Sequence, residues 1–139
     1  MEGTKVLRLK WTALLLSVLI FGGCATVESI RPGQGTVFEV TGQSYNDVWE
    51  NAVRVVSWNF EIIESDKVRG IIQAEGKDNA SDSGQLIRVF IVPVRLVTTE
   101  GETETIIVEV AGRKKSPFQV SGQDWAAMII AAMKLELGL

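Results

Sequence analysis

The sequence predicts a single α+β domain in which an antiparallel sheet of about five strands carries two helices on one face. Three observations lead to this fold class. Apolar residues alternate with a period of two in five runs, they recur at helical spacing in two further runs, and four of the strand-like runs separate the two helical runs. The resulting order, β-α-β-β-β-β-α over residues 36–139, suits helices that lie on one side of an antiparallel sheet.

The first strand is followed at once by the first helix. Residues 36–41 are rich in β-branched side chains and are bounded by glycines, which predicts a short strand. Ser44 with an acid at Asp47 is typical of a capped helix start. The apolar side of this helix is formed by Tyr45, Val48, Trp49, Ala52, Val53 and Val56. We expect Trp49 to be buried, because an indole on such a stripe usually packs in a core.

Two hairpins are expected next. Residues 59–65 and 68–75 are strand-like runs separated by Asp66 and Lys67, and Gly70 is a candidate for a bulge. After a polar loop over 76–84, residues 85–98 and 105–112 form a longer pair around the turn 99–104. Pro93 cannot donate to a ladder. It is therefore expected at a bulge, or where its side of the strand has no neighbour.

The last helix is expected to begin near Ser121, with Ser121 as its N-cap and Asp124 as the acid three residues later. Its apolar stripe consists of Trp125, Met128, Ile129, Ala132 and Met133. Ile130 extends the apolar surface beyond one stripe, so a second packing surface on this helix is expected. It is one candidate contact site for another protein.

The first 24 residues have the composition of an export signal. Three cations precede an apolar run over 11–21, which is too short to span a bilayer, and two glycines stand directly before Cys24. The stretch Phe21-Gly22-Gly23-Cys24 resembles the lipobox of bacterial lipoproteins, with Phe21 where leucine is usual. The resemblance implies that residues 1–23 are a removed signal peptide and that Cys24 carries the lipid. An ordinary cleaved signal and a retained anchor are the alternatives.

Residues 24–35 are expected to form the acylated cysteine and a flexible tether, because this stretch lacks periodicity and ends in Pro32-Gly33-Gln34-Gly35. Fully extended, the tether would reach about 35 to 40 Å from the bilayer. Ala25, and not Asp, follows the cysteine. In lipoproteins of double-membraned bacteria this implies the outer membrane, here with the domain facing the periplasm.

Charge and residue types exclude several function classes. Without residues 1–23, 11 Lys and Arg stand against 16 Asp and Glu, which argues against nucleic acid or anionic headgroups as main partners. Three adjacent cations, Arg113, Lys114 and Lys115, fit a solvated turn, with an acidic contact as the alternative. The chain has no histidine, and its one cysteine is the lipidation candidate. We expect no catalytic residues, no metal and no cofactor.

Two non-catalytic functions remain. The layout over 36–139 is similar to the small helix-grip-like domains of envelope-assembly lipoproteins, which implies an accessory subunit that contacts an envelope protein partner. The alternative is a carrier or sensor that holds a small apolar ligand between helices and sheet. The candidate partner or ligand surface is formed by Trp49, Phe90, Trp125, Met128 and Met133. Close packing of these side chains would favour the first function, and a cavity of several hundred Å³ would favour the second.

Overall fold

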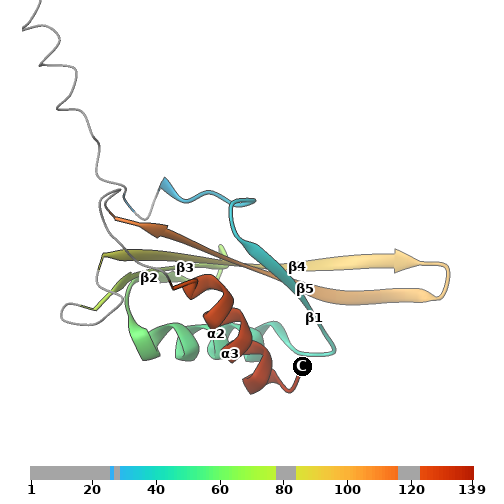
Figure 1. Ribbon diagram of the computed structural model, residues 1–139. Helices are drawn as coiled ribbons and strands as arrows, with labels where there is room; N and C mark the ends of the chain where they lie inside the picture. Colours follow the sequence, from blue (N-terminus) through green and yellow to red (C-terminus); the bar gives the residue numbers. More distant parts are fainter. Residues whose placement is uncertain (1–25, 27–28, 78–83, 116–122) are drawn as a thin grey trace, which may run out of the picture.

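An open antiparallel sheet with both helices on one of its faces makes up the fold (Figure 1). The computed structural model describes residues 26, 29–77, 84–115 and 123–139. The strands are β1 (Thr36–Thr41), β2 (Phe60–Asp66), β3 (Ile71–Gly76), β4 (Gln85–Thr98) and β5 (Gly101–Lys114), and the helices are α2 (Tyr45–Asn59) and α3 (Trp125–Leu137). The strands lie in the order β1-β5-β4-β3-β2. The predicted fold class and element order are confirmed.

Helix α2 begins and ends with side chains that satisfy its free backbone groups. The Ser44 hydroxyl accepts a hydrogen bond from the Asp47 N–H, as the sequence predicted. At the other end the Lys77 ammonium donates to the carbonyls of Ser57 (2.9 Å) and Trp58 (3.3 Å). A cation at a helix C-terminus also interacts favourably with the helix dipole. The first contact caps the helix, and the second connects its C-terminal end to the residue that follows β3.

The start of α3 differs from the prediction. The helix begins at Trp125, and the Asp124 carboxylate accepts the Ala127 N–H at 3.1 Å, so Asp124 is the N-cap itself. Ser121, which the sequence suggested as the cap, lies outside the described residues. A carboxylate caps a helix as well as a hydroxyl does, so the acid directly before the apolar run was the better signal. Gly138, in the left-handed conformation, ends the helix.

The first hairpin has a longer turn than predicted. Residues 67–70 connect β2 to β3, and Gly70 has φ of +68° there. Gly70 is therefore not a bulge. The irregular register of this hairpin lies between Ile62 and Glu64 instead.

The second hairpin has a shorter turn than predicted. Thr99 and Glu100 alone connect β4 to β5, and pairing runs without a break from Thr98 and Gly101 to Gln85 and Lys114. Residues 102–104, two of them acidic and all expected in the turn, lie on β5. Pairing with residues 95–97 of β4 outweighs the low strand propensity of residues 102–104.

The hydrophobic core lies between the sheet and the helices. From the sheet it contains Phe38, Val40, Phe60, Ile72, Ala74, Ile87, Val89, Ile91, Ile106, Val108 and Val110. The helices contribute Val48, Trp49, Ala52, Val55, Val56, Trp125, Ile129, Ile130 and Met133. The rings of Phe60 and Trp125 meet edge to face with centroids 5.3 Å apart. Both helices are thus held to the sheet by aromatic and aliphatic packing.

The β4–β5 hairpin extends well past the rest of the sheet (Figure 1). Strand β3 pairs with β4 only as far as Phe90, and the Ile91 N–H donates to the Gly70 carbonyl at 2.8 Å. Residues 92–104, which lie beyond this point, are here called the arm. Strand β1 still pairs with β5 as far as Thr105, so only residues 95–104 of the arm are two-stranded. Pro93 lies just past the last contact with β3, which confirms its predicted place beside an unpaired strand side.

Candidate interaction surface on the open sheet face

The segment that precedes β1 lies across the sheet face opposite the helices (Figure 1). Residues 29–35, here called the strap, place Ile30 against Leu86 and Ala111. Ile30 is 1% exposed, as fully buried as the residues of the main core. This small second cluster attaches the strap to β4 and β5.

Polar contacts fix the strap along its length. The Glu109 carboxylate accepts hydrogen bonds from the Gly33 N–H (2.8 Å) and the Gly35 N–H (2.7 Å). Arg88 donates to the Ile30 carbonyl at 2.8 Å, and Arg113 donates to the Ser29 hydroxyl at 3.0 Å. Charged donors and acceptors make the stronger hydrogen bonds. The sequence predicted a flexible tether over residues 24–35. Residues 29–35 of that range belong instead to the folded domain.

A pocket of about 310 Å³ opens beside the strap. The strap, the β2–β3 turn and strands β4 and β5 form its walls. Its lining consists of Ile30, Arg31, Pro32, Arg69, Gly70, Ile71, Arg88, Phe90, Val92, Ile107 and Glu109. Most of these side chains are apolar, and the Arg88 guanidinium lies 5.3 Å from the centre of the Phe90 ring. The pocket can take an apolar group with a polar end near its arginine side chains.

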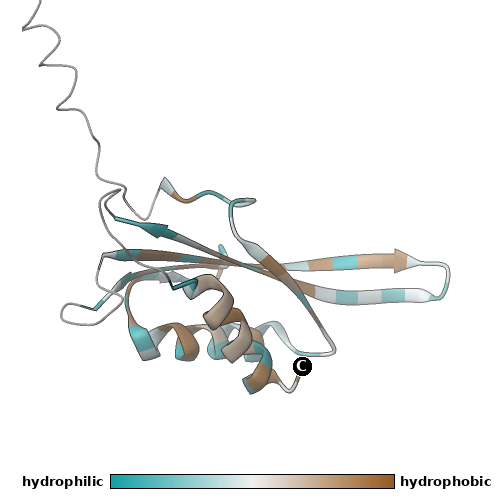
Figure 2. Ribbon diagram, in the orientation of Figure 1, coloured by the Kyte–Doolittle hydropathy of each residue, from teal (hydrophilic) through white to brown (hydrophobic). Residues whose placement is uncertain are grey.

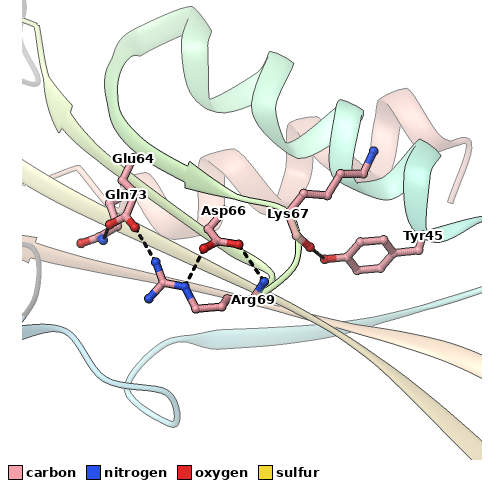
Figure 3. A network of polar contacts seen from close by, with 6 residues as sticks. All are labelled: Tyr45, Glu64, Asp66, Lys67, Arg69 and Gln73. Carbon is pink, nitrogen blue, oxygen red and sulfur yellow. Dashed lines mark hydrogen bonds and ion pairs between the residues drawn. The ribbon is translucent and has the colours of Figure 1, made fainter.

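One wall of the pocket is held in place by a network around Arg69 (Figure 3). Arg69 contacts Asp66 at 2.6 Å and Glu64 at 2.5 Å, and Glu64 also accepts from Gln73. The backbone N–H of Arg69, and then its guanidinium, lower the pKa of Asp66. The same carboxylates raise the pKa of Arg69. The network fixes the turn that borders the pocket.

Tyr45 connects this turn to helix α2. Its hydroxyl donates to the Lys67 carbonyl at 2.7 Å (Figure 3). Partial burial, and then the charge of Asp66, raise the pKa of Tyr45. The phenol ring is also stacked near Trp49, with centroids 6.4 Å apart. The helix layer thereby fixes the position of a loop that lines the opposite face.

The apolar surface continues from the pocket along the arm. Val92, Val94 and Leu96 follow Phe90 on the same face of β4 by their period of two, and Val92 and Leu96 are each about half exposed. Figure 2 shows apolar positions running along the arm past the part of the sheet that the helices cover. These residues, with Phe90 and Ile107, are here called the open-face stripe.

The other face of the arm has a different character. Arg95 and Glu102 form an ion pair at 3.7 Å there, next to the exposed Val97. The arm thus has a mainly apolar face and a charged face, which points to a contact made on one side.

The structure does not bring the five predicted surface residues together. Trp49, Trp125 and Met133 are in the core, as expected for Trp49. Met128 is 44% exposed on α3, while Phe90 lies on the opposite face of the sheet and lines the pocket. Cys24 lies outside the described residues. Of the five candidates, Phe90 alone belongs to the open face.

The remaining open-face residues were not identified from the sequence as part of a site. Alternation over 86–96 indicated two apolar faces but not which of them the helices leave uncovered. Glu109 is separated by more than 70 residues from the strap that it binds. Its apolar neighbours in sequence, Val108 and Val110, were the only local sign of its burial.

Within the described part of the chain, no helix is long and apolar enough to cross a membrane. No protein-family model matches this chain, and no curated protein does.

Proposed function

We propose that this protein is a lipid-anchored, non-catalytic subunit of a cell-envelope complex, and that it binds its protein partner with the open sheet face. The observation that carries the proposal is the continuous apolar surface formed by the pocket and the open-face stripe. The likeness of residues 21–24 to a lipobox supports the anchor, and Ala25 supports the outer membrane, facing the periplasm.

The open face has the features of a protein-binding surface. An apolar stripe that continues from a pocket is more than the scattered exposed side chains of an ordinary protein surface. The pocket of about 310 Å³ offers a place for one anchoring side chain of a partner, since binding energy tends to concentrate at such buried groups. Arg31, Arg88 and the Arg69 network supply a polar border.

The composition supports a binding role over catalysis. The chain lacks histidine, and acylation of Cys24 would remove its thiol. On the open face the carboxylate of Glu109 is occupied by backbone N–H groups of the strap. Arg69 is likewise engaged by two acids. These groups hold the surface together.

The carrier function gains no support from the packing between helices and sheet. Val48 and Val56 of α2 and Met133 of α3 are each fully buried there, against Val89 and Val108 of the sheet. The space expected for an apolar ligand is occupied by side chains. The apolar pocket lies on the opposite face.

A charge placed on the open face should abolish partner binding. Leu96→Lys and Val92→Lys each put a cation on the open-face stripe without touching the core. Val97→Lys is the matched control, because Val97 is 82% exposed and lies on the other face of the arm. The acylated chain is cross-linked in native membranes, and the adducts are identified by mass spectrometry.

We expect the yield of one cross-linked adduct to fall at least tenfold in Leu96→Lys and in Val92→Lys and to stay unchanged in Val97→Lys. Equal loss from all three variants would show a nonspecific effect of charge, and equal persistence would show that the partner binds elsewhere. Either result contradicts the open face as the binding surface.

A further inference from the structure

The strap is both a wall of the pocket and the connection to the proposed anchor. Ile30, Arg31 and Pro32 line the pocket, and the chain continues from Ser29 toward Cys24. Any movement of residues 29–35 would therefore change the binding surface and the distance from the anchor at the same time.

The contacts of the strap can be broken without opening the main core. Its apolar attachment is Ile30 on Leu86 and Ala111, a cluster separate from the one under the helices. Its polar attachment consists of Glu109, which accepts from the N–H groups of Gly33 and Gly35, and of two arginines, Arg88 and Arg113, which donate to Ile30 and Ser29. Strap and core lie on opposite faces of the sheet, so the strap can open locally while the core stays folded.

The two positions of the strap differ greatly in reach. With the strap bound, the chain between Cys24 and Ser29 spans at most about 18 Å. With the strap released, the chain between Cys24 and Thr36 spans at most about 40 Å. Release would also remove three lining residues from the pocket.

We propose that the strap is a tether of two lengths that couples the binding surface to the distance from the membrane. The bound strap completes the pocket and holds the domain close to the bilayer, and the released strap opens the pocket and lets the domain rise. A partner that contacts Ile30 or Pro32 then favours the short form, because it binds one state better than the other. The coupling rests on the proposed anchor and partner, whereas the attachment of the strap does not.

The strap itself is tested in the soluble Cys24→Ser chain by amide hydrogen exchange. Glu109→Ala removes the acceptor of the Gly33 and Gly35 amides, and Glu39→Ala, at an exposed carboxylate of β1, is the matched control. We expect exchange of both glycine amides to accelerate at least tenfold in Glu109→Ala and to stay unchanged in Glu39→Ala. Exchange of the core amides of β4 should remain slow in both variants, which shows that the domain is folded. Unchanged glycine exchange in Glu109→Ala would overturn the proposal.

The change in length is tested with the acylated chain in phospholipid vesicles. Lys114→Cys adds the sole free thiol of the acylated chain, and this thiol is labelled with a donor dye while the vesicles contain acceptor lipids. We expect energy transfer to fall in Glu109→Ala and not in Glu39→Ala, because the connector lengthens by up to about 20 Å. Equal transfer in both variants would overturn the two-length tether. If mass spectrometry finds no lipid on Cys24, the proposed function fails, and the exchange result still decides whether the strap is attached.

Discussion

Gly70 combines a left-handed backbone with a close approach to the neighbouring strand. Its φ is +68°, and a side chain there would run into the Ile91 carbonyl. That approach places the Gly70 carbonyl where it accepts the Ile91 N–H, the last contact between the β2–β3 hairpin and β4. Both the turn and the wall of the pocket that it forms depend on this glycine.

Gly70→Ala should destabilise the domain by about 2 to 4 kcal/mol, because strain at positive φ adds to a clash with backbone. Gly42→Ala is the control, since Gly42 has φ of +80° and nothing within 4 Å of an added methyl group. The control should lose only about 1 to 2 kcal/mol. Urea unfolding measures both. Equal losses would contradict the close approach of Gly70 to β4.

Asp66 makes the stability of the β2–β3 turn depend on pH. Its pKa is lowered from the ordinary 3.8 by hydrogen bonds from Arg69, so the folded state holds the ionised form better than the unfolded state does. The stabilisation is therefore fully present well above pH 3.8. It is lost as the pH falls through that value and on through the lower pKa of the folded state.

Asp66→Asn should flatten the fall in stability between pH 5 and pH 2. Arg69→Gln should flatten it less, because it removes the guanidinium but keeps the backbone N–H, which is the larger cause of the lowered pKa of Asp66. The measurement is the urea midpoint at several pH values across this range. If the urea midpoints of both variants depend on pH as steeply as that of the wild type, the Asp66–Arg69 contact does not persist in solution.

At the scale of elements, the sequence predicted the strands and helices well and their ends less well. The helix of Trp49 has its predicted cap, and its predicted apolar stripe faces the core with all but Tyr45 and Val53 buried, because both signals are local. The end of β4 at Thr98 was predicted correctly, but the start of β5 was misplaced, because residues 102–104 are turn-like by composition and become a strand only through pairing with 95–97. Local propensity does not contain that information.

The arm also shows how an unpaired strand side is protected. The backbone groups of successive strand residues point to opposite edges of the strand. The edge on which the Ile91 N–H meets Gly70 is therefore also the edge to which Pro93, Arg95 and Val97 direct their backbone groups. Among the described residues this side has no strand partner beyond Ile91. Proline offers no N–H and arginine adds a charge. Both features oppose pairing with another chain.

Pro93→Val should promote self-association through this side of β4. The variant gains a backbone donor and a β-branched side chain, worth about 1 to 2 kcal/mol, or a 5- to 30-fold rise in the association constant. Sedimentation velocity over a range of concentrations measures it. Thr103→Val adds similar apolar surface without a new backbone donor and should sediment like the wild type. If Pro93→Val also does so, proline does not protect this side.

At the scale of the whole molecule, the two faces of the sheet have separate tasks. One face is covered by the helices and stabilises the domain. The other carries the strap, the pocket and the open-face stripe. That both helices share one face was predicted from the sequence, but which face of β4 they cover was not, because alternation in β4 is apolar on both faces. The attachment of Gly33 and Gly35 to Glu109 is likewise a contact between distant segments, and a Pro-Gly-rich stretch alone suggests a flexible connector.

The same division places the proposed anchor away from the folding core. Four residues separate Cys24 from the strap, and the strap rests on the face that the main core does not use. Loss of the lipid should therefore change where the protein resides and leave its fold intact. Cys24→Ser should retain the wild-type circular dichroism spectrum and unfolding midpoint.

In the native host, Cys24→Ser should move from the membrane to the soluble envelope fraction, because the proposed acyl chains hold the domain to the bilayer and its net charge does not. Ala25→Asp is the matched control. By likeness to other lipoproteins it should keep the lipid and the membrane association but shift from the outer to the inner membrane. Fractionation, with mass spectrometry of the N-terminus, distinguishes the two variants. A Cys24→Ser chain that stayed in salt-washed membranes would mean that protein contacts or a retained apolar segment, and not a lipid, provide the attachment.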